Sequence, residues 1–180
     1  MYTENLCYIA RMFLDHKNLT CEIDAFYFYV LCERKDNGFH IVGYFSKEKD
    51  SSENNNLSCI MVLPSVQRAG YGKFLIDFSY SLSIIEGKTG SPEKPLSDLG
   101  HRTYVSYWTH KVLNVLLQND QSQLSIMDIS NATSITPTDI QYVLESYDIL
   151  KCNNGRYYFN SDPEYLKKIL AKNGHPGRPV

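Results

Sequence analysis

The pattern of apolar and polar positions predicts that the chain opens with a helix followed by a β-hairpin. An amphipathic helix is predicted ahead of the polar stretch DHKN, from apolar residues at helical spacing: Leu6, Ile9, Ala10, Phe13 and Leu14. Two short runs, 25–31 and 39–45, are rich in aromatic and β-branched residues, and the turn sequence DNG at 36–38 lies between them. These two runs are therefore expected to pair as a hairpin.

A strand, a glycine-rich turn and a helix are predicted next. Residues 47–56 are polar and predict a loop, whereas the continuous apolar run 57–64, closed by proline, predicts a buried central strand. The stretch VQRAGYGKFL follows at 66–75. A helix is predicted after Gly70, before the glycines and prolines of 86–98, with one apolar face: Phe74, Leu75, Phe78, Leu82 and Ile85.

The second half of the chain is predicted to be mostly helical. Ser97 or Asp98 can cap a helix that runs through YWTHKVLNVLLQ, with four residues inward: Trp108, Val112, Val115 and Leu116. From Gln121 the order is a short helix, a turn, a helix and two small strands around 153–155, which indicates a winged-helix-like subdomain. We therefore expect an α/β core at 1–120 and a helix-turn-helix part of the same domain at 121–180.

Composition restricts the type of protein and the type of site. With 180 residues, 43% of them hydrophobic, the chain can bury one core and a small appendage. A net charge of −2 gives no general attraction to nucleic acid or membranes, so an anion site must be local. Five scattered cysteines without a CxxC pair favour reduced thiols and neither a disulfide framework nor a metal site. No apolar run of transmembrane length and no leader pattern is present, which predicts a soluble intracellular protein.

The glycine-rich turn has the chemistry of an anion site. A helix N-terminus presents unpaired backbone N–H groups and about half a positive charge. Gly70 and Gly72 lack the Cβ atoms that would keep a diphosphate away from the backbone, and Arg68 and Lys73 add positive charge. The stretch matches neither the Walker pattern nor GxGxxG. An ordinary helix-start turn with solvated charges is the alternative.

Four longer blocks carry a family resemblance: NLCYIARMFLDHK, HIVGYFSKEK, QRAGYGKFLIDFSY and EGKTGSPEKPLSDLG. Together they resemble the MYST family of histone acetyltransferases, whose core belongs to the GNAT-like acetyltransferase class. The resemblance implies a GNAT-like acetyl-CoA-binding core and transfer of acetyl groups from acetyl-CoA to lysines of histone tails. It also implies a nuclear location and subunits of a chromatin-modifying complex as partners.

The resemblance assigns acetyl-CoA binding to the strand after the family's cysteine, to the turn and to two serines. Ser97 can also be a helix cap, and the alternative for Ser106 is an ordinary surface hydroxyl. The matched positions are Ile60, Met61, Val62, Gln67, Arg68, Ala69, Gly70, Tyr71, Gly72, Lys73, Ser97 and Ser106.

The same resemblance assigns the catalytic residues. A lysine amine with a pKa of about 10.4 is mostly protonated at neutral pH, so a base is needed, and the family's glutamate matches Glu93. The family's active-site cysteine matches Cys59, which could accept the acetyl group first or could only line the pocket during direct attack. The LDHK lysine, which the family acetylates on itself, matches Lys17.

The chain also departs from the family pattern. The family's zinc finger and opening strands precede the NLC block, and we expect an N-terminally truncated core here. Ser65 and Val66, and His101 and Arg102, replace residues that the family usually has. The alternative function is therefore a catalytically weak paralogue that acts as a chromatin scaffold. The segment 135–150 carries no arginine or lysine, so sequence-specific DNA reading is not expected.

Overall fold

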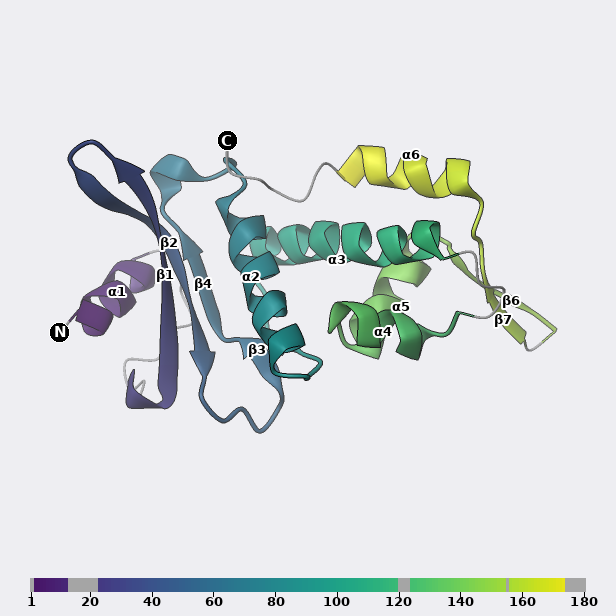
Figure 1. Cartoon of the computed structure of the whole chain (residues 1–180), viewed down its shortest axis with the longest axis horizontal. Helices are drawn as coiled ribbons and strands as arrows, with labels where there is room; N and C mark the ends of the chain where they lie inside the picture. The colour runs from purple at the N-terminus through teal and green to yellow at the C-terminus, as the bar shows by residue number, and fades with distance from the viewer. Residues whose placement is uncertain (1, 13–22, 120–123, 155, 174–180) are drawn as a thin grey trace.

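The computed structural model describes residues 2–12, 23–119, 124–154 and 156–173, which form an antiparallel sheet and several helices (Figure 1). The helices are α1 (Tyr2–Arg11), α2 (Tyr71–Ile85), α3 (Asp98–Gln118), α4 (Ile126–Thr133), α5 (Pro137–Ser146) and α6 (Pro163–Asn173). The strands are β1 (Phe26–Lys35), β2 (Gly38–Glu48), β3 (Asn55–Leu57), β4 (Cys59–Val62), β5 (Ser91–Pro92), β6 (Leu150–Asn153) and β7 (Arg156–Phe159). Short 3₁₀ turns occupy Ile23–Ala25 and Pro64–Val66.

The predicted hairpin is confirmed as β1 and β2. The two strands pair antiparallel from Phe26 opposite Glu48 to Lys35 opposite Gly38. Gly38 has a φ of 125°, which a side chain would make unfavourable, so the glycine of DNG makes this turn possible. The strands extend beyond the apolar runs because backbone pairing continues through their polar ends.

The prediction of one buried central strand at 57–64 is wrong. The chain changes partners at Ser58, so β3 pairs parallel with β5 and β4 pairs antiparallel with β2. The three-stranded sheet has the order β1-β2-β4, which makes β2 the central strand. In the described residues β4 is therefore an edge strand, and of its side chains only that of Met61 is buried. Lys47, predicted to begin a loop, is a buried residue of β2.

Helices α1 and α2 cover opposite faces of this sheet (Figure 1). Leu6 and Ala10 of α1 pack against Tyr44 and Met61 on one face. Leu75 of α2 belongs to a second apolar cluster on the other face, together with Phe45 and Leu57. The alternation of side chains along β2 therefore supplies two separate cores. Phe13 and Leu14 of the predicted opening helix lie outside the described residues.

The predicted apolar face of α2 is only partly correct. Leu75 is buried, but Phe74 and Phe78 are partly exposed and Ile85 is 82% exposed. Helix α2 packs against the sheet and also against α3, so its buried stripe is wider and displaced: Tyr71, Leu75, Ile76, Ser79, Tyr80 and Ser83. Small serines fit this crowded interface because their hydroxyls donate to carbonyls within the helix, as Ser79 does to Ile76 O at 2.7 Å.

Helix α3 forms the centre of the largest core. Trp108, Val112 and Leu116 are buried as predicted, and Val115 is partly buried. The same apolar cluster contains Ile76 and Tyr80 of α2 and buried residues of the C-terminal elements: Ile129, Ile135, Ile140, Val143, Leu144, Ile149, Leu166 and Ile169. The C-terminal elements occur in the predicted order of helix, helix and two strands, and α6 follows them. The domain boundary at residue 120 remains a prediction.

Candidate functional site

The glycine-rich turn follows β4 and the 3₁₀ turn Pro64–Val66, and it leads into α2, in the predicted order of strand, turn and helix. Gly70 is the N-cap residue of α2 with a φ of 92°, and Arg68 has a φ of 67°, whereas Ala69 between them has no positive φ. Alternating signs of φ turn successive N–H groups toward one side, which is the geometry of an anion-binding nest. Gly70 offers no side-chain acceptor to the first turn of the helix. The backbone donors and the positive helix end therefore point to an anion.

Gly72 is not required by the packing of the fold. A Cβ atom built on Gly72 would lie 3.9 Å from Thr103 Cγ2 and 4.0 Å from Val62 Cγ2, which are ordinary contacts. Gly72 is also absent from the residues with positive φ. The fold can therefore accept a side chain here, so neither packing nor backbone conformation requires the glycine, and its bare backbone leaves room for a ligand.

Two ionisable side chains of the turn are held by neighbouring elements. Lys73 Nζ donates to the carbonyl of Asn173 at 3.3 Å, and burial lowers the pKa of the Lys73 ammonium. The Tyr71 hydroxyl donates to Glu33 Oε1 of β1 at 3.1 Å. The hydrogen bond from Lys35, and to a smaller extent that from Tyr71, lowers the pKa of the Glu33 carboxyl. Burial is the main reason that the pKa of the Tyr71 hydroxyl is raised, and the hydrogen bond to Glu33 is the second. The start of α2 is thus fixed to β1 and to α6, while Arg68 is exposed.

Strand β4 places its four residues on alternate faces. Ile60 and Val62 contact the cluster on the α2 face, and Met61 belongs to the α1 face. Gln67 Nε2 donates to Val62 O at 3.1 Å, so this side chain closes the turn onto the end of the strand. Cys59 is half-buried, and its backbone N–H donates to Ser46 Oγ at 3.2 Å.

The loop that carries Glu93 is held from two sides. On one side, the Glu93 N–H donates to Leu57 O at 2.9 Å, which places it beside the chain that leads into Cys59. On the other side, Gly90 N donates to Ser134 O at 2.9 Å, and Lys94 Nζ lies 3.5 Å from Asp139 Oδ1 of α5. The Glu93 side chain itself is exposed. The backbone is therefore fixed while the carboxylate stays accessible to a substrate.

The two predicted serines have different surroundings. Ser97 is the N-cap of α3, and its hydroxyl accepts from Gly100 N at 3.1 Å, which confirms the capping role. Ser106 Oγ donates to the carbonyl of Asn173 at 2.8 Å, the same oxygen that Lys73 contacts. Ser106 is therefore a contact between α3 and α6 and not an ordinary surface hydroxyl.

Asn173 is the residue near this site that sequence reasoning missed. Its side chain accepts a hydrogen bond from the Tyr147 hydroxyl at 2.8 Å and donates one to Ile169 O at 2.9 Å. Its backbone carbonyl accepts hydrogen bonds from Lys73 Nζ and Ser106 Oγ. These partners come from α2, α3, α6 and the end of α5. An asparagine at the end of a polar helix has no local pattern that reveals such long-range contacts.

Hydrogen bonds of the described residues join the turn to β4 and join the start of α2 and the interior of α3 to the end of α6. Lys17 lies outside the described residues. Among the described residues, no group of three or more His, Cys, Asp and Glu is placed to hold a metal. None of the described helices is long and apolar enough to cross a membrane.

Comparison with known proteins gives consistent matches over nearly the whole chain. The model of the MOZ/SAS family matches residues 1–178. The chain is 50% identical over 180 residues to "Histone acetyltransferase of the MYST family 2" from Arabidopsis thaliana, covering 40% of that protein. It is 50% identical over 178 residues to "Histone acetyltransferase Tip60 homolog" from Caenorhabditis elegans, 94% of this chain and 39% of that protein. The match to "Histone acetyltransferase ESA1" from Yarrowia lipolytica is 46% over 174 residues, 95% of this chain and 37% of that protein. The chain thus spans about 40% of the length of these relatives.

Proposed function

The chain belongs to the MOZ/SAS family, and from this we propose that it binds acetyl-CoA and transfers the acetyl group to lysine ε-amines of histone tails. The glycine-rich turn is the observation that carries the proposal. Positive φ values at Arg68 and Gly70 and an open backbone at Gly72 form a cradle for a diphosphate at the start of α2. Arg68, exposed beside this cradle, supplies a positive charge for it.

The edge position of β4 supports the binding of the rest of acetyl-CoA. In the described residues β4 pairs with β2 alone, so the backbone groups that do not face β2 lie on its outer edge, where Val62 O already accepts from Gln67 Nε2. We propose that this edge, formed by Ile60, Met61 and Val62, runs beside the rest of the cofactor. An extended pantetheine arm carries amide groups that can pair with such an edge. The arm would lead from the turn at Gly70 back along β4 toward Cys59. In that arrangement the thioester would lie near the loop of Glu93.

Glu93 is proposed to act as the general base. The substrate lysine must lose a proton before its nitrogen attacks the thioester, and an accessible carboxylate on a fixed backbone can accept that proton. The backbone of Glu93 is bonded to Leu57, two residues before Cys59, and its carboxylate is exposed. We infer direct attack by the amine, with Cys59 lining the site, because Cys59 is a half-buried residue of a strand.

The remaining details of the proposal follow from family membership. We propose that the sheet and α2 form a GNAT-like core and that 121–180 form its winged-helix-like part. Histone tails as substrates, a nuclear location and partner subunits of a chromatin-modifying complex belong to the same proposal. In this reading Ser97 caps α3 and also contributes to the pocket, and Ser106 and Lys73 link the pocket to α6.

The test compares Glu93→Gln with the control Glu145→Gln. Glu145 is an exposed residue of α5. Histone acetylation is measured by mass spectrometry and acetyl-CoA binding by calorimetry. Glu93→Gln should keep its affinity for acetyl-CoA and lose about 10²–10⁴-fold in turnover, with partial recovery at high pH. The control should remain active. A parent protein that binds histones and acetylates none would support the scaffold alternative, and full activity in Glu93→Gln would remove Glu93 from the mechanism.

A further inference from the structure

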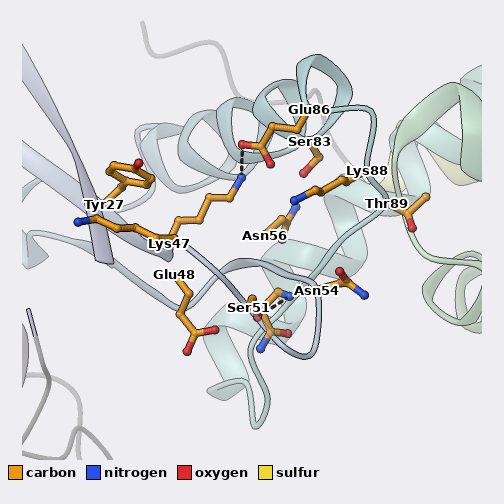
Figure 2. A pocket seen from close by; sticks show the side chains of 12 residues that line it. Tyr27, Lys47, Glu48, Ser51, Asn54, Asn56, Ser83, Glu86, Lys88 and Thr89 are labelled. Atoms are coloured by element: carbon orange, nitrogen blue, oxygen red, sulfur yellow. Dashed lines mark hydrogen bonds and ion pairs between the residues drawn. The ribbon is translucent and has the colours of Figure 1, made fainter. Parts of the chain in front are cut away.

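A polar pocket lies at the far end of α2 from the glycine-rich turn. Its volume is about 130 Å³, and its walls come from the end of β2, the start of β3 and the loop after α2. Figure 2 shows five side chains around its centre: Lys47, Asn56, Ser83, Glu86 and Lys88. Helix α2 has 15 residues and so spans roughly 22 Å at 1.5 Å per residue. The pocket is therefore separate from the proposed diphosphate cradle at the start of α2.

Asn56 is the unusual residue of this pocket. It is 3% exposed, and neither Nδ2 nor Oδ1 of its side chain has a hydrogen-bond partner. The side chain is also wedged in place, because a Cβ atom on Gly90 would lie only 2.6 Å from Asn56 Cβ. A buried amide is normally bonded at both ends. The Asn56 Nδ2 donor needs an acceptor and the Asn56 Oδ1 acceptor needs a donor, so an occupant of the pocket should offer both.

The charges of the pocket favour a negatively charged occupant. Lys47 is 8% exposed and pairs with Glu86 at 2.5 Å, which leaves that pair neutral. Lys88 has no carboxylate partner among the described residues. The ionisable residues of the lining sum to a positive charge: Lys47, Lys49 and Lys88 against Glu48 and Glu86. This excess offsets the negative end of the α2 dipole, which by itself would disfavour an anion.

We propose that this pocket binds a small phosphate-type oxyanion that retains one O–H group. Asn56 Nδ2 and the ammonium groups of Lys88 and Lys47 donate to the oxygens of the anion. The O–H of the anion donates to Asn56 Oδ1, so both ends of the buried amide are satisfied. Hydrogen phosphate has this combination, whereas sulfate has acceptor oxygens and no donor. The proposal is independent of acetyl transfer.

Proton–nitrogen correlation spectra of the Asn56 side-chain amide provide the direct measurement, with inorganic phosphate, sulfate and N-acetylphosphoserine as probes. Phosphate should shift the Asn56 resonances and bind several-fold more tightly than sulfate near neutral pH. N-acetylphosphoserine loses its last proton near a pKa of about 6, so it should match phosphate only below that pH. A phosphoserine probe that binds as tightly as phosphate at neutral pH would overturn the requirement for an O–H donor.

Variants separate this pocket from other anion sites. Lys88→Ala should weaken phosphate binding by about tenfold, which is the loss of one charge-assisted hydrogen bond. The exposed lysine change Lys168→Ala and the turn change Arg68→Ala should leave the Asn56 shifts unaltered. Because Lys88 is exposed, its variant is expected to fold even if a change at Asn56 does not. Asn56 resonances that stay unmoved at high phosphate concentration would overturn the proposal and leave a water-filled pocket. Resonances that move equally in Lys88→Ala would also overturn it, because Lys88 would then not bind the anion.

Discussion

Replacing Gly72 by alanine should separate the stability of the fold from the binding of acetyl-CoA. The new methyl group would meet Thr103 and Val62 at 3.9 and 4.0 Å, so the fold loses nothing in packing. Alanine is favoured over glycine in a helix, and a gain of about 0.5 kcal/mol is expected. For a chain of this size such a gain raises Tm by about 1–2 °C. A thermal unfolding curve followed by circular dichroism measures this.

The same methyl group should weaken acetyl-CoA binding. It keeps the diphosphate away from the N–H groups at the start of α2, and one lost charge-assisted hydrogen bond is worth about 1.5–3 kcal/mol. The affinity measured by calorimetry should therefore fall by about tenfold to a hundredfold. Gly72→Val, with a larger side chain, should abolish detectable binding in a folded protein.

Gly70→Ala is the matched control for this reasoning. Gly70 has a φ of 92°, so a side chain there strains the backbone by about 1–2 kcal/mol and should lower Tm. The two glycines of one turn are thus expected to change stability in opposite directions. An acetyl-CoA affinity in folded Gly72→Ala that stays within about twofold of the parent value would refute the diphosphate assignment.

Three further outcomes are expected. Cys59→Ala should lose far less turnover than Glu93→Gln, and an isolable acetyl thioester on Cys59 would contradict direct attack. Incubation with acetyl-CoA alone should acetylate Lys17 and remove its positive charge, and peptide mapping that finds Lys17 unmodified during normal histone acetylation would reject this. The lowered pKa of Glu33 stabilises the fold above the ordinary carboxyl pKa of about 4.3, and this stabilisation is lost as the pH falls through the lower folded-state value. Urea unfolding should therefore find Glu33→Gln less stable than the parent at neutral pH, with the difference disappearing in acid.

The elements with strong local signals were predictable from the sequence. The DNG turn predicted the hairpin, because Gly38 can adopt the positive φ that the turn needs. Ser97 predicted the start of α3, because its hydroxyl caps the helix. The position of the glycine-rich turn at the start of α2 was also predictable, because Gly70 adopts a positive φ there. Each of these signals acts within a few residues.

Features set by distant contacts were not predictable. The apolar run 57–64 hides the change of partner at Ser58, which depends on β5 more than thirty residues later. The buried stripe of α2 includes Ser79 and Ser83 because α3 packs on that side, and hydrophobicity alone points to Phe74 and Phe78 instead. Asn173 and Asn56 are polar residues in polar stretches. Their contacts and burial come from tertiary structure alone.

The shared core around α3 has a consequence for the order in which the chain folds during synthesis. Trp108, Val112 and Leu116 are buried partly by residues that lie as far along the chain as Ile169. At about 5–20 residues per second, the ribosome needs roughly 3–10 seconds to make the fifty or so residues between α3 and those partners. During that interval the apolar side of α3 is exposed on the nascent chain. Residues 124–170 therefore bury the apolar side of α3 only after they have been synthesised. A chaperone that binds apolar helices can bind α3 during that interval.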